Sequence, residues 1–146
     1  MKIFIDTSSL FKLYHQEIGT EELEGIFAGY NITHIYLSEI TKIEFTSTIW
    51  KKVRAQLISI QQAEATLALF EIDIEKYNFI STDSLILEQA KNLTNKYGTD
   101  GLRTLDSIQL STCIALGNQV ELFITADKLL KSLIESEGLN TQIMGQ

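Results

Sequence analysis

Two short apolar segments, one near each end of the chain, run directly into an aspartate. The first segment is 2–5, followed by Asp6, and the second is 122–126, followed by Asp127. Continuous runs of β-branched and aromatic residues are typical of strands that are buried on both faces, as in a parallel sheet. Ligands of parallel sheets bind at the carboxyl ends of the strands. We therefore expect both aspartates at one edge of a sheet, in a carboxylate cluster that needs a cation.

Strand-like and helix-like segments alternate along the chain. Strands are expected at 2–5, 34–37, 77–80, 121–125 and 141–144. Helices are expected at 7–14, 20–28, 38–53, 59–70, 82–97, 102–116 and 128–136. The residues expected to cap helix N-termini are Thr20, Ser38, Ser59 and either Thr82 or Asp83. The alternation predicts an α/β fold of three layers, with a mostly parallel sheet of roughly five strands between helices.

Length and composition limit the classes of protein that this chain can represent. At 146 residues, with no proline and no low-complexity tract to mark a linker, a single domain over 1–146 is expected. No segment is long and apolar enough to span a bilayer, and the N-terminus does not resemble a signal peptide. The only cysteine, Cys113, has no partner for an internal disulfide and is expected to be a reduced, buried thiol. We expect a cytoplasmic protein with no membrane partner.

Two further acids lie on helical segments whose neighbouring positions are apolar. Glu44 is flanked by Ile43 and Phe45, and Asp106 shares a helical stripe with Leu110 and Cys113. A buried carboxylate pairs with a base, takes up a proton or binds a metal ion. The nearby Arg103 cannot neutralise four carboxylates.

Each acid also has a structural explanation. Asp6 and Asp127 stand at strand-to-helix turns, where aspartate commonly caps the next helix. Asp106 has the spacing of a capping box with Gln109, and Glu44 has the same spacing from Thr41, although Ser38 competes as the cap. These explanations stay open for each acid taken alone.

Taken together, the four acids predict a site for a hard cation. Oxygen ligands alone favour Mg²⁺ or Mn²⁺, and neither His15 nor His34 has the spacing of a zinc ligand. Two carboxylate-held ions can activate water and stabilise the leaving oxygen of a phosphodiester. The net charge of −7 gives no support for a polyanionic substrate. However, four basic residues fall within thirteen positions beside a single acid, Glu44; they are Lys42, Lys51, Lys52 and Arg54.

Four segments, in this order, resemble the motifs of the PIN-domain ribonucleases, most closely the VapC-type toxins of toxin–antitoxin pairs. These segments are 3–10, 37–44, 102–110 and 123–127. The resemblance covers essentially the whole chain and implies a PIN-like fold and Mg²⁺- or Mn²⁺-dependent endonucleolytic cleavage of RNA. It also implies a homodimer and a cognate antitoxin that fills the active-site groove.

The resemblance also assigns roles to individual residues. Asp6, Glu44 and Asp106 match the central metal-binding acids, and Asp127 matches a fourth, looser ligand. Ser8 and Thr125 match hydroxyl positions that support the site. The candidates for RNA phosphate contacts are Lys42, Lys51, Lys52, Arg54 and Arg103. The segment after Asp127 departs from the family pattern, because many relatives have a further acid or Asn there, followed by an aromatic residue.

Two other functions are compatible with parts of this pattern. The segment after the first strand resembles that of haloacid-dehalogenase-like phosphatases, but these need a second aspartate where this chain has Ser8. The other alternative is a catalytically silent PIN-like module that binds RNA or a protein partner. Cleavage that needs metal and is lost in Asp106→Asn separates a nuclease from such a module.

Overall fold

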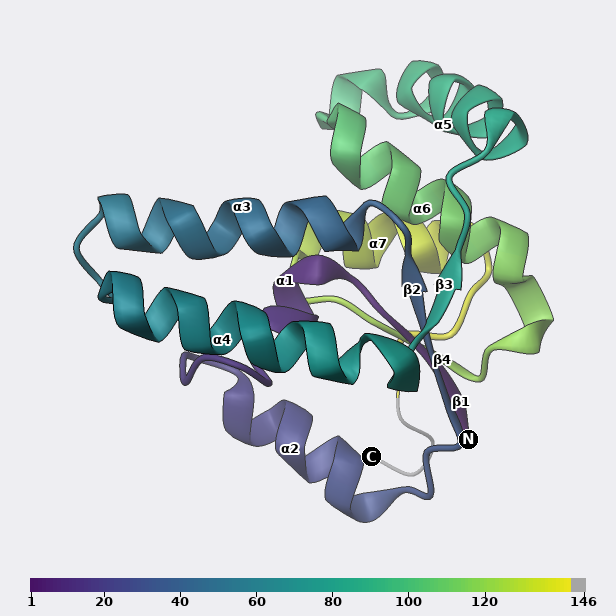
Figure 1. Ribbon diagram of the computed structural model, residues 1–146. Helices are drawn as coiled ribbons and strands as arrows, with labels where there is room; N and C mark the ends of the chain where they lie inside the picture. The colour runs from purple at the N-terminus through teal and green to yellow at the C-terminus, as the bar shows by residue number, and fades with distance from the viewer. Residues whose placement is uncertain (143–146) are drawn as a thin grey trace.

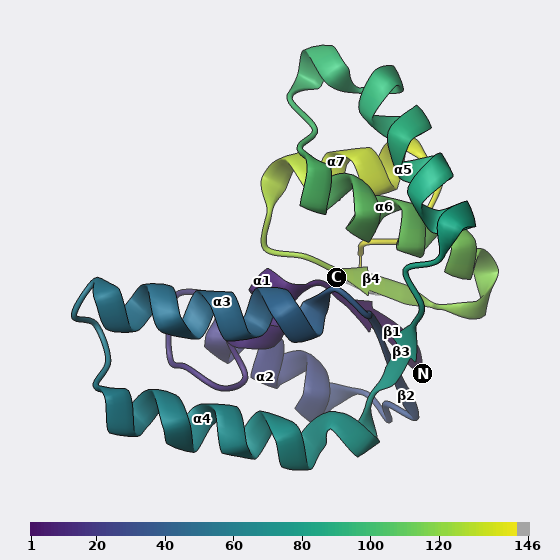
Figure 2. The ribbon, with the colours of Figure 1, turned by 45° about the horizontal axis from the view of Figure 1, so that its top comes forward.

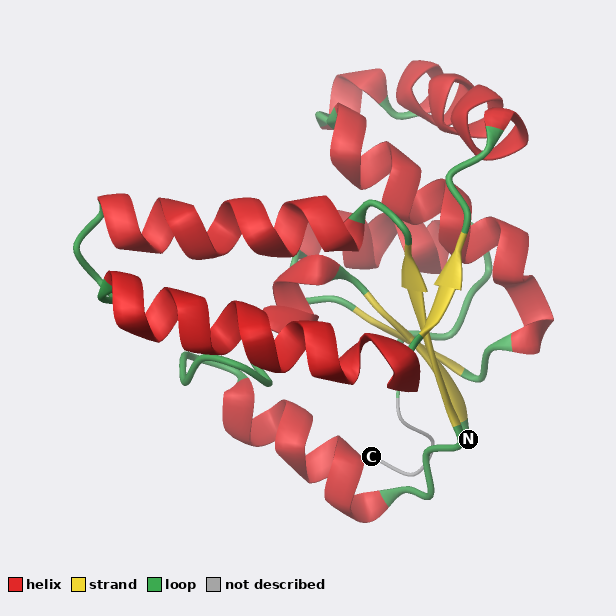
Figure 3. Ribbon diagram, viewed as in Figure 1, coloured by secondary structure: helices red, strands yellow, loops and turns green. Residues whose placement is uncertain are grey.

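Four parallel strands form the sheet, in the order β3-β2-β1-β4. In the computed structural model, which describes residues 1–142, they are β1 (Lys2–Ile5), β2 (His34–Ser38), β3 (Asn78–Ile80) and β4 (Leu122–Ile124). Phe4 of the central strand β1 aligns with Tyr36 of β2 on one side and with Phe123 of β4 on the other. Because every pairing is parallel, the carboxyl ends of the strands lie at the same edge of the sheet, to which the arrowheads of β2 and β3 point in Figure 3.

Helices cover both faces of this sheet, which confirms the expected three layers (Figures 1 and 2). They are α1 (Thr7–Phe11), α2 (Thr20–Gly29), α3 (Thr41–Arg54), α4 (Ile60–Asp73), α5 (Ser84–Lys96), α6 (Thr104–Leu116) and α7 (Lys128–Ser136). Successive residues of β1 point to opposite faces. Phe4 packs with residues of α5, α6 and α7, whereas Ile3 and Ile5 pack with residues of α1, α3 and α4.

Several helix starts follow the expected capping chemistry. Ser59 and Gln62 form a reciprocal capping box at α4, with the Ser59 Oγ accepting from the Gln62 backbone N–H at 3.1 Å. The Asp83 Oδ1 accepts from the Ile86 backbone N–H at 2.9 Å and caps α5. For α2 the expected cap Thr20 is wrong, since Gly19, with a φ of 94°, is the N-cap.

The predicted start of α3 at Ser38 is also wrong. Ser38 is the last residue of β2 and is fully buried, and α3 begins only at Thr41, without a side-chain cap. The buried strand continues for one residue more than its apolar pattern indicates, so Ser38 belongs to the sheet.

The expected fifth strand falls partly outside the described residues. Thr141 and Gln142 are not in a strand, and 143–144 lie outside the described residues, so the sheet described here has four strands. Within residues 1–142 no helix combines the length and the apolar character needed to cross a membrane. Cys113 is buried as expected, and burial raises the pKa of its thiol.

Candidate active site at the carboxyl edge of the sheet

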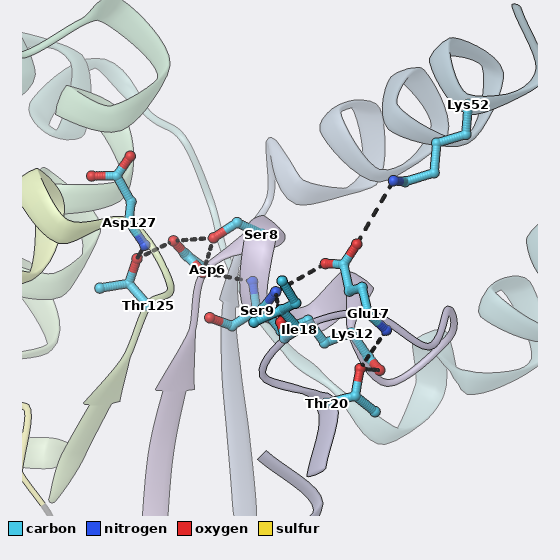
Figure 4. Close-up of polar contacts among 10 residues, drawn as sticks. All are labelled: Asp6, Ser8, Ser9, Lys12, Glu17, Ile18, Thr20, Lys52, Thr125 and Asp127. Atoms are coloured by element: carbon cyan, nitrogen blue, oxygen red, sulfur yellow. Dashed lines mark hydrogen bonds and ion pairs between the residues drawn. The ribbon is translucent and has the colours of Figure 1, made fainter. Parts of the chain in front are cut away.

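Asp6 lies where β1 ends and is almost fully buried, with 4% of its surface exposed. Its Oδ1 accepts hydrogen bonds from the Ser9 backbone N–H and the Ser8 Oγ, both at 2.9 Å, so it also caps α1 (Figure 4). Its Oδ2 accepts from the Thr125 Oγ1. Burial raises the pKa of Asp6, although these hydrogen bonds oppose the shift. The hydrogen bonds from Ser8 and Thr125 are consistent with their predicted supporting role.

Asp127 follows β4 on the adjacent strand and is linked to Asp6 through Thr125. The Thr125 Oγ1 donates to Asp6 and accepts from the Asp127 backbone N–H at 3.1 Å. The Asp127 Oδ1 accepts from the Leu130 backbone N–H at 2.7 Å and caps α7. The side chain is exposed and lies above Thr125 in Figure 4. Asp6 and Asp127 thus cap α1 and α7, as their structural explanation predicted, and both also lie at the carboxyl edge of the sheet.

Asp106 lies in the first turn of α6 and is partly buried. Burial raises the pKa of its carboxyl, and the negative charges of Asp127 and Asp6 raise it further, while Arg103 opposes them. The capping-box explanation is wrong for this acid, because α6 begins at Thr104 and its N-cap is Arg103. Asp106 is therefore close enough to both other aspartates for their charges to repel its own.

Glu44 lies in the first turn of α3, opposite α6. Its Oε1 accepts from the Thr7 Oγ1 and from the Gln109 Nε2, both at 2.8 Å. Every hydrogen bond that its carboxylate receives within residues 1–142 goes to Oε1, so the other oxygen, Oε2, keeps its capacity to bind a ligand. The capping box with Thr41 is wrong here too, because the N-cap of α3 is Ile40 and Thr41 is inside the helix.

Three buried polar residues without a predicted functional role form a network beside Glu44. Thr7, Thr41 and Gln109 are 6%, 0% and 2% exposed, and they come from α1, α3 and α6. The Thr7 Oγ1 lies 3.0 Å from the Thr41 Oγ1, and the Gln109 Nε2 is within 3.4 Å of both hydroxyls. The signal for Gln109 was an amide between Ile108 and Leu110 on a largely buried helix. Because Gln109 lies one turn after Asp106 on α6, this network fixes Glu44 of α3 relative to Asp106.

The four acids suit a hard divalent cation by their chemistry, since they offer only carboxylate oxygens. A cation placed among Asp6, Asp106 and Asp127 would relieve the repulsion that raises the pKa of Asp106. Their side chains are not gathered closely, however: among residues 1–142 no group of three His, Cys, Asp or Glu side chains has the geometry of a metal site. The donor set fits the cation, but binding would have to draw the carboxylates together.

The structure separates the five basic residues that were candidates for phosphate contacts. Lys52 lines a pocket together with Glu44 and Ser8. Arg103 is exposed and acts on Asp106 from the turn before α6. Lys42 places its Nζ 4.5 Å from the centre of the Phe79 ring. The two others, Lys51 and Arg54, are exposed near the C-terminal end of α3.

Comparison with known proteins places these observations in a family. The family model described as PIN domain matches residues 3–134. A search of curated proteins finds no match. Mycobacterium tuberculosis VapC20, a toxin described as cleaving the sarcin-ricin loop, is similar in structure, with a TM-score of 0.69 and 14% identity over 90% of this chain and 94% of that one.

Two complexes also contain similar chains. VapBC2 from Rickettsia felis, bound to a DNA fragment from its promoter, gives a TM-score of 0.65 and 15% identity over 97% of this chain and 98% of that one. A toxin–antitoxin complex from Klebsiella pneumoniae gives a TM-score of 0.61 and 18% identity over 86% of each chain. At these identities the structural likeness shows the fold. Because the family model matches residues 3–134, nearly the whole chain, the chain belongs to the PIN domain family.

Proposed function

We propose that this protein is a metal-dependent endoribonuclease that acts as the toxin of a VapBC-type toxin–antitoxin pair. Asp6, Glu44 and Asp106 are the proposed ligands of Mg²⁺ or Mn²⁺, and Asp127 is the fourth, looser ligand. The observation that carries the proposal is the placement of Asp6 and Asp127 after adjacent parallel strands, at the edge where Asp106 begins α6. Burial raises the pKa of Asp106 there, and the negative charges of Asp127 and Asp6 raise it further. A folded protein that maintains such repulsion at the edge of a parallel sheet is prepared for a cation.

Neighbouring residues of the chain hold two of the proposed metal ligands in position. Ser8, Ser9 and Thr125 hold the Asp6 carboxylate, and Thr7 and Gln109 hold Glu44 by one oxygen only. Bound Mg²⁺ or Mn²⁺ supplies the charge that lowers the pKa of an attacking water and stabilises the phosphodiester's leaving oxygen. These hydrogen bonds orient Asp6 and Glu44 in advance, while binding of a cation would still have to draw the four carboxylates together.

The proposed partners are an RNA substrate, a cognate antitoxin and a second copy of the chain, all within the cytoplasm. The similarity to VapBC2 and to the Klebsiella pneumoniae toxin–antitoxin complex supports the antitoxin, and the RNA substrate and the second copy are proposed from the family resemblance. The description of VapC20 as a sarcin-ricin loop cleaving toxin makes that RNA loop a rational first substrate to test.

The alternatives from the sequence make different predictions. A phosphatase of the haloacid-dehalogenase kind needs an acid at Ser8, and here the Ser8 Oγ instead donates to Asp6. A silent PIN-like binding module would bind RNA without cutting it, and this second function remains the one to test against.

The test is cleavage of end-labelled RNAs, including a sarcin-ricin loop RNA, by antitoxin-free protein with Mn²⁺, with Mg²⁺ and with chelator. We expect discrete products that require metal and are absent with an identically purified Asp106→Asn variant. Equal product patterns from both proteins would point to a contaminating nuclease. RNA binding without any metal-dependent cleavage would favour the silent module.

A further inference from the structure

A pocket of about 330 Å³ extends from the candidate active site along α1 and α3. One part of its lining is Ser8 and Glu44, which belong to the site already described. Another part is made of three charged side chains that the site does not use, Lys12, Glu17 and Lys52. Figure 4 shows Glu17 between Lys12 and Lys52, with Asp6 and Ser8 beyond Lys12.

These charged groups are largely removed from water. The side chains of Lys12, Lys52 and Glu17 are only 15%, 22% and 29% exposed. In such surroundings charges interact more strongly than on an open surface. The pocket lining contains two lysines, Lys12 and Lys52, and two glutamates, Glu17 and Glu44. Glu44 is assigned to the proposed cation, so Glu17 is the one carboxylate that faces both ammonium groups.

The two lysines are held in different ways. The Lys12 Nζ lies 3.0 Å from the Glu17 Oε1 and donates to the Ile18 carbonyl at 2.7 Å, so this ammonium is fixed within the loop before α2. The Lys52 Nζ lies 3.7 Å from the Glu17 Oε2 and 5.2 Å from the centre of the Phe11 ring. Within residues 1–142 it donates no hydrogen bond at normal distance. An ammonium group has three donors, so Lys52 retains the capacity to bind an anion in the pocket.

We infer that Lys52 is a subsite for an RNA backbone phosphate next to the one that is cleaved, and that Glu17 occupies this ammonium when no RNA is bound. The inference rests on the proposed nuclease function. Glu44 and Lys52 line the same pocket, so a strand whose scissile phosphate meets the acids extends over Lys52. Lys12 holds Glu17 by the shorter contact, of 3.0 Å. An RNA phosphate therefore replaces Glu17 at Lys52, where the contact is the longer one, of 3.7 Å.

This arrangement explains how a chain with a net charge of −7 can contact a polyanion. What matters is the local arrangement: Lys52 lies on the wall of the pocket itself, and its contact with Glu17, at 3.7 Å, is long. It also distinguishes Lys52 from its sequence neighbours Lys51 and Arg54, which are exposed and do not line this pocket.

The experiment measures binding of a short fluorescein-labelled single-stranded RNA by anisotropy over a range of salt concentrations. All proteins carry Asp106→Asn and are kept in chelator, so that no cleavage occurs. Lys52→Met keeps the stem over Phe11 and removes the charge, Lys52→Arg restores it, and Glu17→Gln removes the competing carboxylate. The matched control is Lys91→Met with Glu88→Gln, an exposed ion pair of 3.0 Å on α5.

We expect Lys52→Met to weaken RNA binding several-fold and to reduce the slope of log K against log salt by about 0.7, the value for one phosphate contact on a single strand. Lys52→Arg should restore the slope. Glu17→Gln should tighten binding several-fold, whereas a merely structural ion pair predicts weaker binding after this change. The control pair should match the parent protein.

Two results with RNA alone would overturn the subsite: an unchanged slope in Lys52→Met, or weaker binding in Glu17→Gln at an unchanged melting temperature. Orthophosphate binding that depends on Lys52, with RNA binding that does not, would also overturn it, since the subsite would then serve free phosphate. Failure of the proposed function is distinguishable, because it appears in the parent chain as absence of metal-dependent cleavage, whatever Lys52 does.

Discussion

Gln109→Met tests whether the buried network around Glu44 prepares a metal ligand. Methionine has nearly the length of glutamine but no amide, so the 2.8 Å hydrogen bond from the Gln109 Nε2 to the Glu44 Oε1 disappears while the space stays filled. The Thr7 Oγ1 remains as a donor to the same oxygen. The variant therefore loosens Glu44 without leaving a cavity.

The expected change in folding stability is small because two effects oppose each other. Losing a hydrogen bond to a charged group destabilises by about 1.5–3 kcal/mol. The Gln109 Oε1, however, is buried and has no hydrogen-bond partner within residues 1–142, and removing an unsatisfied polar atom returns about 1–3 kcal/mol. The net free energy of unfolding should stay within roughly 1 kcal/mol of the parent value, measured by urea denaturation in chelator.

The expected change in metal binding is large by comparison. Loss of a group that orients a metal ligand typically lowers metal affinity by about 10- to 100-fold. Mn²⁺ binding is measured directly, by calorimetry or by the electron paramagnetic resonance signal of free Mn²⁺, so the readout is independent of cleavage. Gln61→Met, an exposed glutamine on α4, is the matched control and should bind Mn²⁺ like the parent. A Gln109→Met protein that folds and binds Mn²⁺ with unchanged affinity would refute the reasoning.

Three further predictions concern stability and reactivity. Burial raises the pKa of Asp106, and the negative charges of Asp127 and Asp6 raise it further, so its ionised form destabilises the folded state. In chelator, Asp106→Asn should therefore melt at a higher temperature than the parent near neutral pH, and this difference should shrink as pH falls through the carboxyl range. A melting temperature that falls in this variant would contradict the proposed repulsion. Ser59→Ala should lower the free energy of unfolding by about 1 kcal/mol through loss of the α4 cap, measured in urea against Ser132→Ala within α7. Native Cys113 should resist iodoacetamide and react in urea, because burial raises its pKa and blocks access; rapid labelling of the folded protein would disprove its burial.

The sheet was predictable from local sequence because its strands are short apolar runs. The predicted bounds of β1 and α7 match the structure, β2 and β3 differ from their predictions by one residue at one end, and β4 is one residue shorter at each end. Helix starts were predictable where a side chain supplies the cap, as at Ser59 and Asp83. They were not predictable where Ser38 continues a buried strand or where a glycine with positive φ begins α2.

The candidate site also has a part that could be predicted from the sequence and a part that could not. Asp6 and Asp127 follow apolar strands, so strand direction alone places them at one edge. The contact that orients Glu44 joins residues 65 positions apart and depends on how α3 and α6 face each other. Polar residues on α6 do not by themselves reveal the partner, because several of them are buried; they are Ser107, Gln109, Ser111 and Thr112.

Of these four α6 residues only Gln109 contacts Glu44, because the other three donate their hydrogen bonds to backbone carbonyls. The hydroxyls of Ser107, Ser111 and Thr112 donate to the carbonyls of Thr104, Ile86 and Ile108 respectively. A hydroxyl can satisfy its donor on a nearby carbonyl within its own or the adjacent helix. The longer Gln109 amide instead spans from α6 to α1 and α3, where two threonine hydroxyls and a carboxylate accept its protons. The length of the side chain and the way α6 faces α3 together determine that Gln109 orients Glu44. The length can be read from the sequence, but the packing of the two helices is known only from the folded chain.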